Sequence, residues 1–250
     1  MGFRISTNIA SVNAQRNLND SQMRIGDSMA KLASGSRINK AADDAAGLAI
    51  SENLKAQVRS TRQASRNAQD GVSLVQTAEG GLNELSSIVT RLRELGIQAA
   101  SDTVGDTERG FLDKEVQQLK NEMQRIAQVT KWGSTGLLDG TTPSFDFQIG
   151  INNNEFADRI SFNGSENTAT IDALGLAGLD YTSKAGAQEA LGLLDEAQTN
   201  VNGMRANLGA LQNRLTSTIT NLGVAEENLS AANSRIRDTD VASATAEMTR

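Results

Sequence analysis

The stretch Leu194–Ile236 reads LDEAQTNVNGMRANLGALQNRLTSTITNLGVAEENLSAANSRI. Apolar residues recur in it at alternating steps of three and four, and one polar residue, Thr218, interrupts the series. This repeat indicates a long helix with a narrow apolar stripe. At about 1.5 Å per residue, the helix would be about 65 Å long. It needs partners, because helices gain most of their stability by packing such a stripe. The stripe positions are Leu194, Ala197, Val201, Met204, Leu208, Leu211, Leu215, Thr218, Leu222, Ala225, Leu229, Ala232 and Ile236.

The first half of the chain carries a matching pattern. The same alternation runs from Leu54 to Leu95, and a shorter series continues from Leu112 to Ile126. We expect the returning helix to pack antiparallel against these outgoing helices, because each stripe then covers the other. The adjacent glycines Gly80 and Gly81 mark a candidate break or kink. The predicted rod core consists of Leu92, Leu112, Val116, Leu119, Met123, Ile126, Leu208, Leu211, Leu215, Leu222 and Leu229.

A short β-rich region separates the outgoing helices from the returning one. Residues 132–140 are punctuated by glycine and indicate a loop. Apolar and polar residues then alternate from Phe145 to Ile151, which is the period of a strand. Ile160 and Phe162 suggest a strand that returns after a turn at residues 152–154. We therefore predict a mainly α fold: an elongated antiparallel bundle of long helices, a coiled-coil-like rod, with a small β-hairpin region.

The helix ends are also predicted from local sequence. An amphipathic helix over Ile5–Leu32 should stop at Gly35, because glycine adopts the left-handed conformation at a C-cap. This helix is polar enough that we expect it to fray or be disordered without partners. Asp43 or Asp44 should cap the helix that follows, and Asp106 or Thr107 the next one.

Composition excludes several classes of function. The 250 residues include no cysteine and no histidine, which removes disulfides, thiol nucleophiles and imidazole chemistry. The formal net charge is −6 without a basic block, which argues against nucleic-acid binding. Aromatic residues make up 3%, which fits helical bundles rather than a thick aromatic core. The N-terminus lacks an apolar run of signal-peptide length, and no stretch approaches the ~20 apolar residues of a membrane span. We predict a protein that is not an enzyme and has no cofactor or metal.

Candidate sites of other kinds have simpler interpretations. Asp43 and Asp44 are adjacent and do not face one another on a helix, so capping is favoured over a catalytic pair. Asp238 and Asp240 lack the glycine and later ligands of a calcium loop. The N-glycosylation patterns that begin at Asn163 and at Asn228 are short enough to occur by chance.

Several separate motifs resemble bacterial flagellin. In the returning helix they are MRANLGALQNRL at 204–215 and ENLSAANSRIRDTD at 227–240. In the first half they are LASGSRIN at 32–39, DDAAGL at 43–48 and RLREL at 91–95. Trp132-Gly133 with LLDG at 137–140 also matches, although the family usually has Phe in place of Trp132. The motifs occur in the family's order and cover nearly the whole chain.

The resemblance implies a structural subunit that polymerises into the flagellar filament for motility. It implies five segments: an inner-core helix and connector (1–46), outgoing rod helices (47–140), a hairpin region (141–182), the returning rod helix (183–238) and a second inner-core segment (239–250). Implied partners are further copies of the chain, an export chaperone and a cap protein. The implied export is through the flagellar type III apparatus, to the extracellular flagellum, without membrane insertion.

The resemblance also implies recognition by host receptors. The family positions that correspond to Arg91, Leu95 and Glu115 form the surface seen by the vertebrate Toll-like flagellin receptor. Arg91 and Leu95 are four residues apart and are therefore expected on one helix face. Residues Ala30–Ser51 resemble the peptide sensed by the plant flagellin receptor. The same faces are expected to pack on neighbouring subunits in a filament.

Two departures from the family are visible. The segment between the rod helices is short, so the subunit is a minimal one without large outer domains. The family usually continues past the position of Arg250 with another amphipathic stretch, and on that basis we expect the 250-residue chain to polymerise poorly. The alternatives are a hook–filament junction protein, which shares the terminal pattern, and a generic coiled-coil adaptor.

Overall fold

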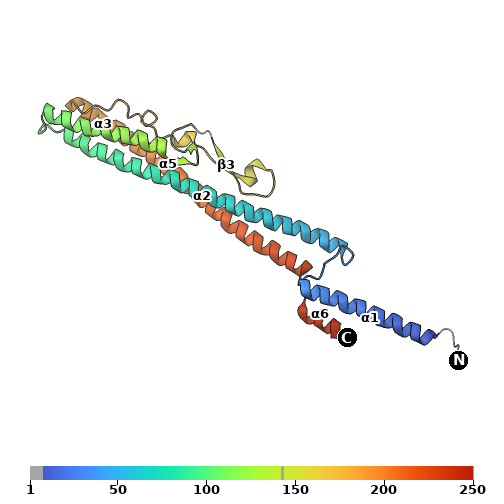
Figure 1. Cartoon of the computed structure of the whole chain (residues 1–250). Helices are drawn as coiled ribbons and strands as arrows, with labels where there is room; N and C mark the ends of the chain where they lie inside the picture. The colour runs from blue at the N-terminus through green and yellow to red at the C-terminus, as the bar shows by residue number, and fades with distance from the viewer. Residues whose placement is uncertain (1–7, 142–143, 250) are drawn as a thin grey trace. The chain divides into compact units, whose positions relative to one another are not determined.

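The computed structural model describes residues 8–141 and 144–249 and confirms a mainly α protein with long helices and small antiparallel hairpins (Figure 1). Expectations for Ile5 and Arg250 fall outside the described residues. The elements are α1 (Ile9–Ser34), α2 (Ala45–Ala99), α3 (Asp106–Val129), β1 (Lys131–Trp132), β2 (Thr135–Gly136), β3 (Phe145–Gln148), α4 (Glu155–Asp158), β4 (Arg159–Phe162), the 3-10 helix η1 (Ser165–Asn167), α5 (Lys184–Arg237) and α6 (Val241–Thr249).

The chain divides into two compact units. The distal unit comprises residues 61–223, and the terminal unit comprises residues 1–60 and 224–250. Each unit contains a stretch of α2 and a stretch of α5, because these two helices are 55 and 54 residues long.

The distal unit is built on three helices that share one apolar core. In it α3 lies beside α2 and α5, as Figure 1 shows, and the ion pairs Arg91–Glu115 and Arg93–Asp195 join α2 to each of the others. The three-and-four repeat supplies this core, because it places one side chain per turn on the shared face. Its members include Leu82, Leu85, Val89, Leu92, Leu95, Val116, Met123, Leu194, Val201, Leu208 and Leu215.

The helix does not break at Gly80 and Gly81, because α2 runs through both residues as one helix. A Cβ built on Gly80 would meet no atom within 4 Å. A Cβ on Gly81 would lie 2.7 Å from Thr130 Oγ1 and 2.8 Å from Leu138 Cδ1. Gly81 therefore allows the chain that follows α3 to approach α2 closely, and it does not break the helix.

The two hairpins lie in the distal unit after α3. Strands β3 and β4 pair antiparallel with Phe145 opposite Phe162 and Phe147 opposite Ile160, which confirms both predicted strands. The predicted loop over residues 132–140 instead contains two-residue strands, β1 and β2, joined by a turn in which Gly133 has a φ of 61°. The β3–β4 hairpin sits close to α2, where a Cβ on Gly71 would lie 3.2 Å from the ring of Phe147.

The turn between α2 and α3 is stabilised by a side chain that the sequence did not single out. Gly105 occupies the N-cap position of α3 and makes no side-chain cap, so the predicted capping by Asp106 or Thr107 is wrong. Arg109 is instead buried here: its Nε donates to Ala99 O at 2.8 Å, its Nη2 to Ser101 O at 2.9 Å, and its Nη1 to Asp106 Oδ1 at 2.7 Å. The last carbonyl groups of a helix lack intrahelical donors, and Arg109 supplies a donor to the carbonyl of Ala99, the last residue of α2.

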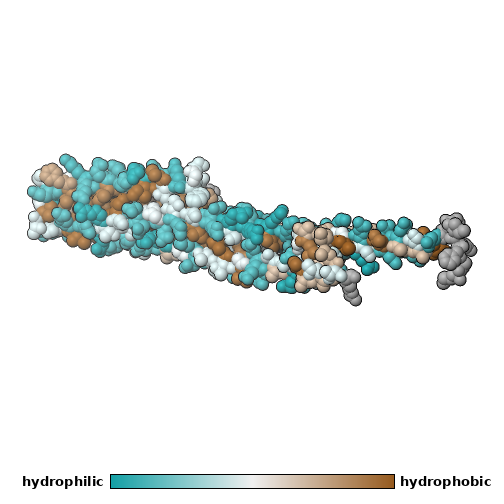
Figure 2. Space-filling view, turned by 60° about the horizontal axis from the view of Figure 1, so that its bottom comes forward, coloured by the Kyte–Doolittle hydropathy of each residue, from teal (hydrophilic) through white to brown (hydrophobic). Residues whose placement is uncertain are grey.

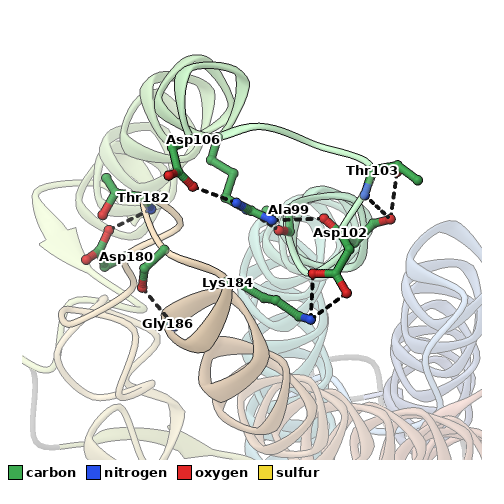
Figure 3. A network of polar contacts seen from close by, with 11 residues as sticks. Ala99, Asp102, Thr103, Asp106, Asp180, Thr182, Lys184 and Gly186 are labelled. Atoms are coloured by element: carbon green, nitrogen blue, oxygen red, sulfur yellow. Dashed lines mark hydrogen bonds and ion pairs between the residues drawn. The ribbon is translucent and has the colours of Figure 1, made fainter.

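The start of α5 is tied to the same turn. Lys184 Nζ donates to both carboxylate oxygens of Asp102, at 2.7 and 2.8 Å (Figure 3). This ion pair lowers the pKa of Asp102, first through the hydrogen bond and then through the charge. The predicted helix start at Ser183 is confirmed within one residue.

Candidate assembly interface

The terminal unit contains a helix whose apolar side chains have no cover. Helix α1 is 26 residues long and none of its residues is buried. Its N-cap Asn8 accepts from Ser11 N, and it ends at Gly35, whose φ of 67° confirms the predicted C-cap. Figure 2 shows brown side chains exposed along this helix. The large apolar side chains that it exposes are Ile9, Val12, Leu18, Met23, Ile25 and Met29.

Packing within the terminal unit does not cover the apolar side chains of α1. Helix α6 lies against α1, with Ala244 as its buried residue and Val241 exposed. Exposed apolar side chains in a row mark interaction surfaces. The exposed face of α1 is therefore the first candidate assembly surface of the molecule.

The connector after α1 is held in one conformation by hydrogen bonds to the end of α5. Arg37 N donates to Arg237 O at 2.6 Å, and Arg37 Nη2 donates to Ile236 O at 2.8 Å. Thr239 N donates to Gly35 O at 3.0 Å, and Ser36 forms an isolated β-bridge with Asp238. The carbonyls at the end of α5 are thus paired with residues about 200 positions earlier in the chain, which local sequence patterns do not reveal.

Two aspartates shape the rest of the connector. Asp43 Oδ2 accepts from Asn39 N and Lys40 N, at 3.0 and 2.9 Å, and these hydrogen bonds hold its pKa below the ordinary value. Asp44 Oδ1 accepts from Gly47 N at 2.8 Å, which confirms its predicted capping role. Ile38 is buried in the same turn, and a Cβ on Gly47 would lie 2.9 Å from its Cδ1. The segment Ala30–Ser51, which comprises the end of α1, the connector and the start of α2, is therefore folded and is not a free peptide.

A second candidate surface lies on α2 and α3 of the distal unit. Arg91 Nη2 donates to Glu115 Oε1 at 2.9 Å and Arg91 Nη1 to Glu94 Oε2 at 3.0 Å. The hydrogen bond to Glu115, followed by that to Glu94, raises the pKa of Arg91. Phe111 is exposed on the same pair of helices, with Lys114 Nζ 5.6 Å from its ring centroid. The surface is amphipathic, and its charged groups are already paired.

The structure corrects the surface expected at Leu95. Its side chain is 2% exposed and belongs to the helical core. A spacing of four places two residues about 40° apart around a helix, which is enough for Arg91 to reach solvent while Leu95 points inward. Leu95 therefore packs in the core beneath this surface, whereas Arg91 and Glu115 are exposed on the surface.

The predicted rod-core residues fall into two groups. Leu92, Val116, Met123, Leu208 and Leu215 are buried. The others are half-buried: Leu112, Leu119, Ile126, Leu211, Leu222 and Leu229. In α5 the burial of the stripe weakens from Thr218 onward, where every stripe position is half-buried.

Two other kinds of site are absent from the part of the chain that the structure describes. Within residues 8–141 and 144–249, no helix is long and apolar enough to cross a membrane. The same described residues contain no group of three or more acidic, histidine or cysteine side chains placed to hold a metal ion.

Comparison with known proteins decides the family. Residues 5–142 match the family model for the bacterial flagellin N-terminal helical region, and residues 191–250 match that for the bacterial flagellin C-terminal helical region. This chain belongs to the flagellin family. The resemblance in the sequence motifs is thereby confirmed, and the family is one of structural proteins of the extracellular flagellar filament.

Individual relatives extend the match to nearly the whole chain. Flagellin of Halalkalibacterium halodurans is 44% identical over 246 residues, which cover 98% of this chain and 89% of the relative. The flagellar filament core protein flaB2 of Brachyspira hyodysenteriae is 42% identical over 95% of this chain and 87% of the relative. The crystal structure of Bacillus cereus flagellin is similar with a TM-score of 0.56 and 30% identity, over 63% of this chain and 88% of that one.

Proposed function

We infer that this protein is a structural subunit of the bacterial flagellar filament and that its mechanism is self-assembly. The observation that carries this inference is α1, a helix of 26 residues without a buried residue and with a series of exposed large apolar side chains. Relatives named as flagellin and as a filament core protein supply the kind of assembly.

The driving force for assembly is the burial of these exposed faces against neighbouring copies. Full burial of a large apolar side chain contributes about 1.5–3 kcal/mol, and the side chains of α1 are already partly covered by their own helix. Each contact also has to offset the entropy lost when the subunit and its termini become ordered. Several such side chains on each copy are therefore needed, and α1 supplies them.

The finer assignments are proposals of the same kind. We propose the five segments 1–46, 47–140, 141–182, 183–238 and 239–250 as the functional division of the chain. The absence of cysteine suits export as an unfolded chain through the flagellar type III apparatus, with an export chaperone that covers exposed apolar helix faces and a cap protein that folds the subunit.

We also propose that host flagellin receptors read this protein. On the α2–α3 surface, Arg91 and Glu115 are exposed and would contact a Toll-like receptor, whereas Leu95 would act by positioning the helix. The connector Ala30–Ser51 is the proposed segment for a plant receptor. Since the connector is folded by contacts of Ile38, Asp43 and Asp44, such a receptor would have to bind it after these contacts open.

The alternatives are less well supported. A hook–filament junction protein would share the terminal helices, but the relatives described above are flagellins and filament core proteins. A generic coiled-coil adaptor does not explain the β3–β4 hairpin or the flagellin family match.

Seeded polymerisation tests the function. Sheared flagellar filaments would be mixed with this chain and elongation followed by light scattering and electron microscopy. The 250-residue chain would be compared with one that carries the further C-terminal stretch of a relative. Elongation by either chain supports a filament subunit. Failure of both, with folded monomers by circular dichroism, would overturn it.

A further inference from the structure

The loop between β3 and β4 carries the most exposed large apolar side chain described in the molecule. Phe156, in the single-turn helix α4, is 95% exposed. Ile151, in the same loop, is also exposed. Aromatic side chains dominate the energetics of protein interfaces, and leaving one almost wholly in water has no benefit for the free subunit.

Hydrogen bonds hold this loop rigidly. Asn154 Oδ1 accepts from Phe156 N and Ala157 N, at 3.0 and 3.2 Å. The buried carboxylate of Asp158 accepts from Asn154 N at 2.9 Å, and Gln148 Nε2 donates to Asn152 O at 2.7 Å. Gly150 fits beside Asp158 because it has no Cβ, which would lie 1.7 Å from Asp158 Oδ1.

Rigidity matters because it lowers the cost of binding. A preorganised backbone loses little conformational entropy when a side chain that it carries is captured, so more of that side chain's burial appears as affinity. The loop therefore presents Phe156 as a knob on a fixed backbone, with Glu155 next to it in the sequence.

A hollow of matching character lies elsewhere in the distal unit, where α3 ends and β1 begins. It measures about 220 Å³ and is lined by Thr77, Arg125, Ile126, Val129, Thr130 and Lys131. Val129 is an exposed apolar side chain at its edge. A cavity of about 150 Å³ is known to hold a benzene molecule, so the size suits a phenyl ring.

The charges favour this hollow over the one beside Asp180 and Glu189. Its charged lining residues are Arg125 and Lys131, although Arg125 also pairs with Glu122 and Lys131 helps to lower the pKa of Asp139. The hollow beside Asp180 and Glu189 would repel Glu155. Glu155, the residue before Phe156, thus has a charge opposite to that of the two cations that line the hollow.

We propose that Phe156 of one copy inserts into the Arg125–Lys131 hollow of a second copy. This deepens the proposed function and rests on it. Because knob and hollow are different surfaces of the same chain, each copy offers one of each and the contact is heterologous. Contacts of this type propagate into open helical arrays when the rotation between copies does not close a ring, which is the arrangement a filament requires.

The first test uses seeded elongation with single substitutions. Phe156→Ala should raise the critical concentration for elongation at least tenfold, whereas Phe156→Leu, which keeps an apolar knob, should lose less. Glu155→Lys should also weaken elongation, and Lys131→Glu in the same chain should restore part of it. Glu196→Lys makes the same charge change at an exposed position of α5 and serves as the matched control. Thermal unfolding of each monomer checks that the fold is kept.

The second test locates the partner surface. Because the chain has no cysteine, chains with Ala157→Cys, which keep the Phe156 ring, can be copolymerised with chains that carry Val129→Cys. Mild oxidation should join the two kinds of chain in filaments and not in dilute monomers. Filaments in which Ala157→Cys chains join only to one another, or to neither kind, would overturn the proposal.

The two levels of inference fail in different ways. If the unsubstituted chain does not elongate seeds in either version, the proposed function fails. If it elongates seeds and Phe156→Ala elongates them equally well, the function stands and the knob-and-hollow contact is overturned.

Discussion

The two compact units carry the same three-and-four repeat but bury it to different extents. In the distal unit, stripe positions such as Leu82, Leu92 and Leu208 are fully buried in one continuous core. In the terminal unit, the described buried apolar side chains are Ile38, Val58 and Ala244, and the α5 stripe from Ala225 onward is half-buried.

This difference shows that the three-and-four repeat predicts a helix but does not predict how deeply the apolar stripe of that helix is buried. In the distal unit a third helix, α3, and two hairpins cover the stripes of α2 and α5 from other sides. In the terminal unit the contacts include the connector hydrogen bonds, the ion pair between Arg237 of α5 and Glu52 of α2, and the packing of α1 against α6. The distal unit buries its apolar stripes within the monomer, whereas the terminal unit leaves the apolar side chains of α1 exposed.

Hydrogen exchange should show the largest contrast. We expect the amides of α1 in the dilute monomer to exchange at least a thousandfold faster than those of residues 82–95, because α1 has no buried residue to resist local opening. Mass spectrometry of exchanged peptides measures this directly. Slow exchange across Ile9–Leu32 in monomers would mean that the terminal helix is stable without partners.

A matched pair of leucine truncations sharpens the comparison. Leu92→Ala should destabilise the protein by about 2–5 kcal/mol, because it leaves a cavity among fully buried side chains. Leu18→Ala should change the free energy of unfolding by less than about 0.5 kcal/mol, since Leu18 is 66% exposed. Urea unfolding followed by circular dichroism gives both values. In seeded elongation, by contrast, Leu18→Ala should have a clear effect and slow the growth of filaments. If Leu18→Ala elongates seeds as well as the unsubstituted chain does, α1 is not part of the interface.

The neighbouring glycines of α2 should respond with opposite signs. Gly80→Ala should stabilise the monomer by about 0.5–1 kcal/mol, because helical glycine is costly and the new methyl group meets nothing. Gly81→Ala should destabilise it by about 1–3 kcal/mol through overpacking against Thr130 and Leu138. Thermal unfolding of the two variants is the measurement. Equal effects would show that α2 is not tightly covered here.

Removal of one buried hydroxyl should have a smaller effect. Tyr181 Oη donates to Leu92 O at 2.9 Å, so Tyr181→Phe should destabilise the distal unit by about 1 kcal/mol. Burial, with a smaller contribution from Asp113, raises the pKa of Tyr181 to about 12. The unfolded pKa is about 10, so this group's stabilisation is complete below pH 10 and is lost as the pH rises from 10 to 12.

The Tyr181→Phe variant also tests the pH dependence of this contribution to stability. The stability difference between the native protein and Tyr181→Phe should shrink between pH 10 and 12, measured by urea unfolding at each pH. A difference that stays constant over this range would mean that the hydroxyl ionises freely in the folded protein.

The sequence by itself determined the local structure of this protein. The apolar repeat predicted the long helices, the alternation from Phe145 predicted β3, and Gly35 and Asp44 were correctly expected at helix ends. The family motifs predicted the flagellin family, which the comparisons confirm. These features depend on backbone geometry and on neighbours within a few residues, so one stretch of chain contains all the information that they need.

Tertiary structure alone decided which faces are covered. The inward position of Leu95, the capping of α2 by Arg109 and the pairing of Arg37 with the end of α5 each depend on contacts with other elements or on the path of a turn. The opposite surroundings of Gly80 and Gly81 have the same origin. The three-and-four repeat indicates that one face of a helix packs against a partner. How many helices or hairpins cover that face, and how large they are, depends on how distant segments of the chain pack together.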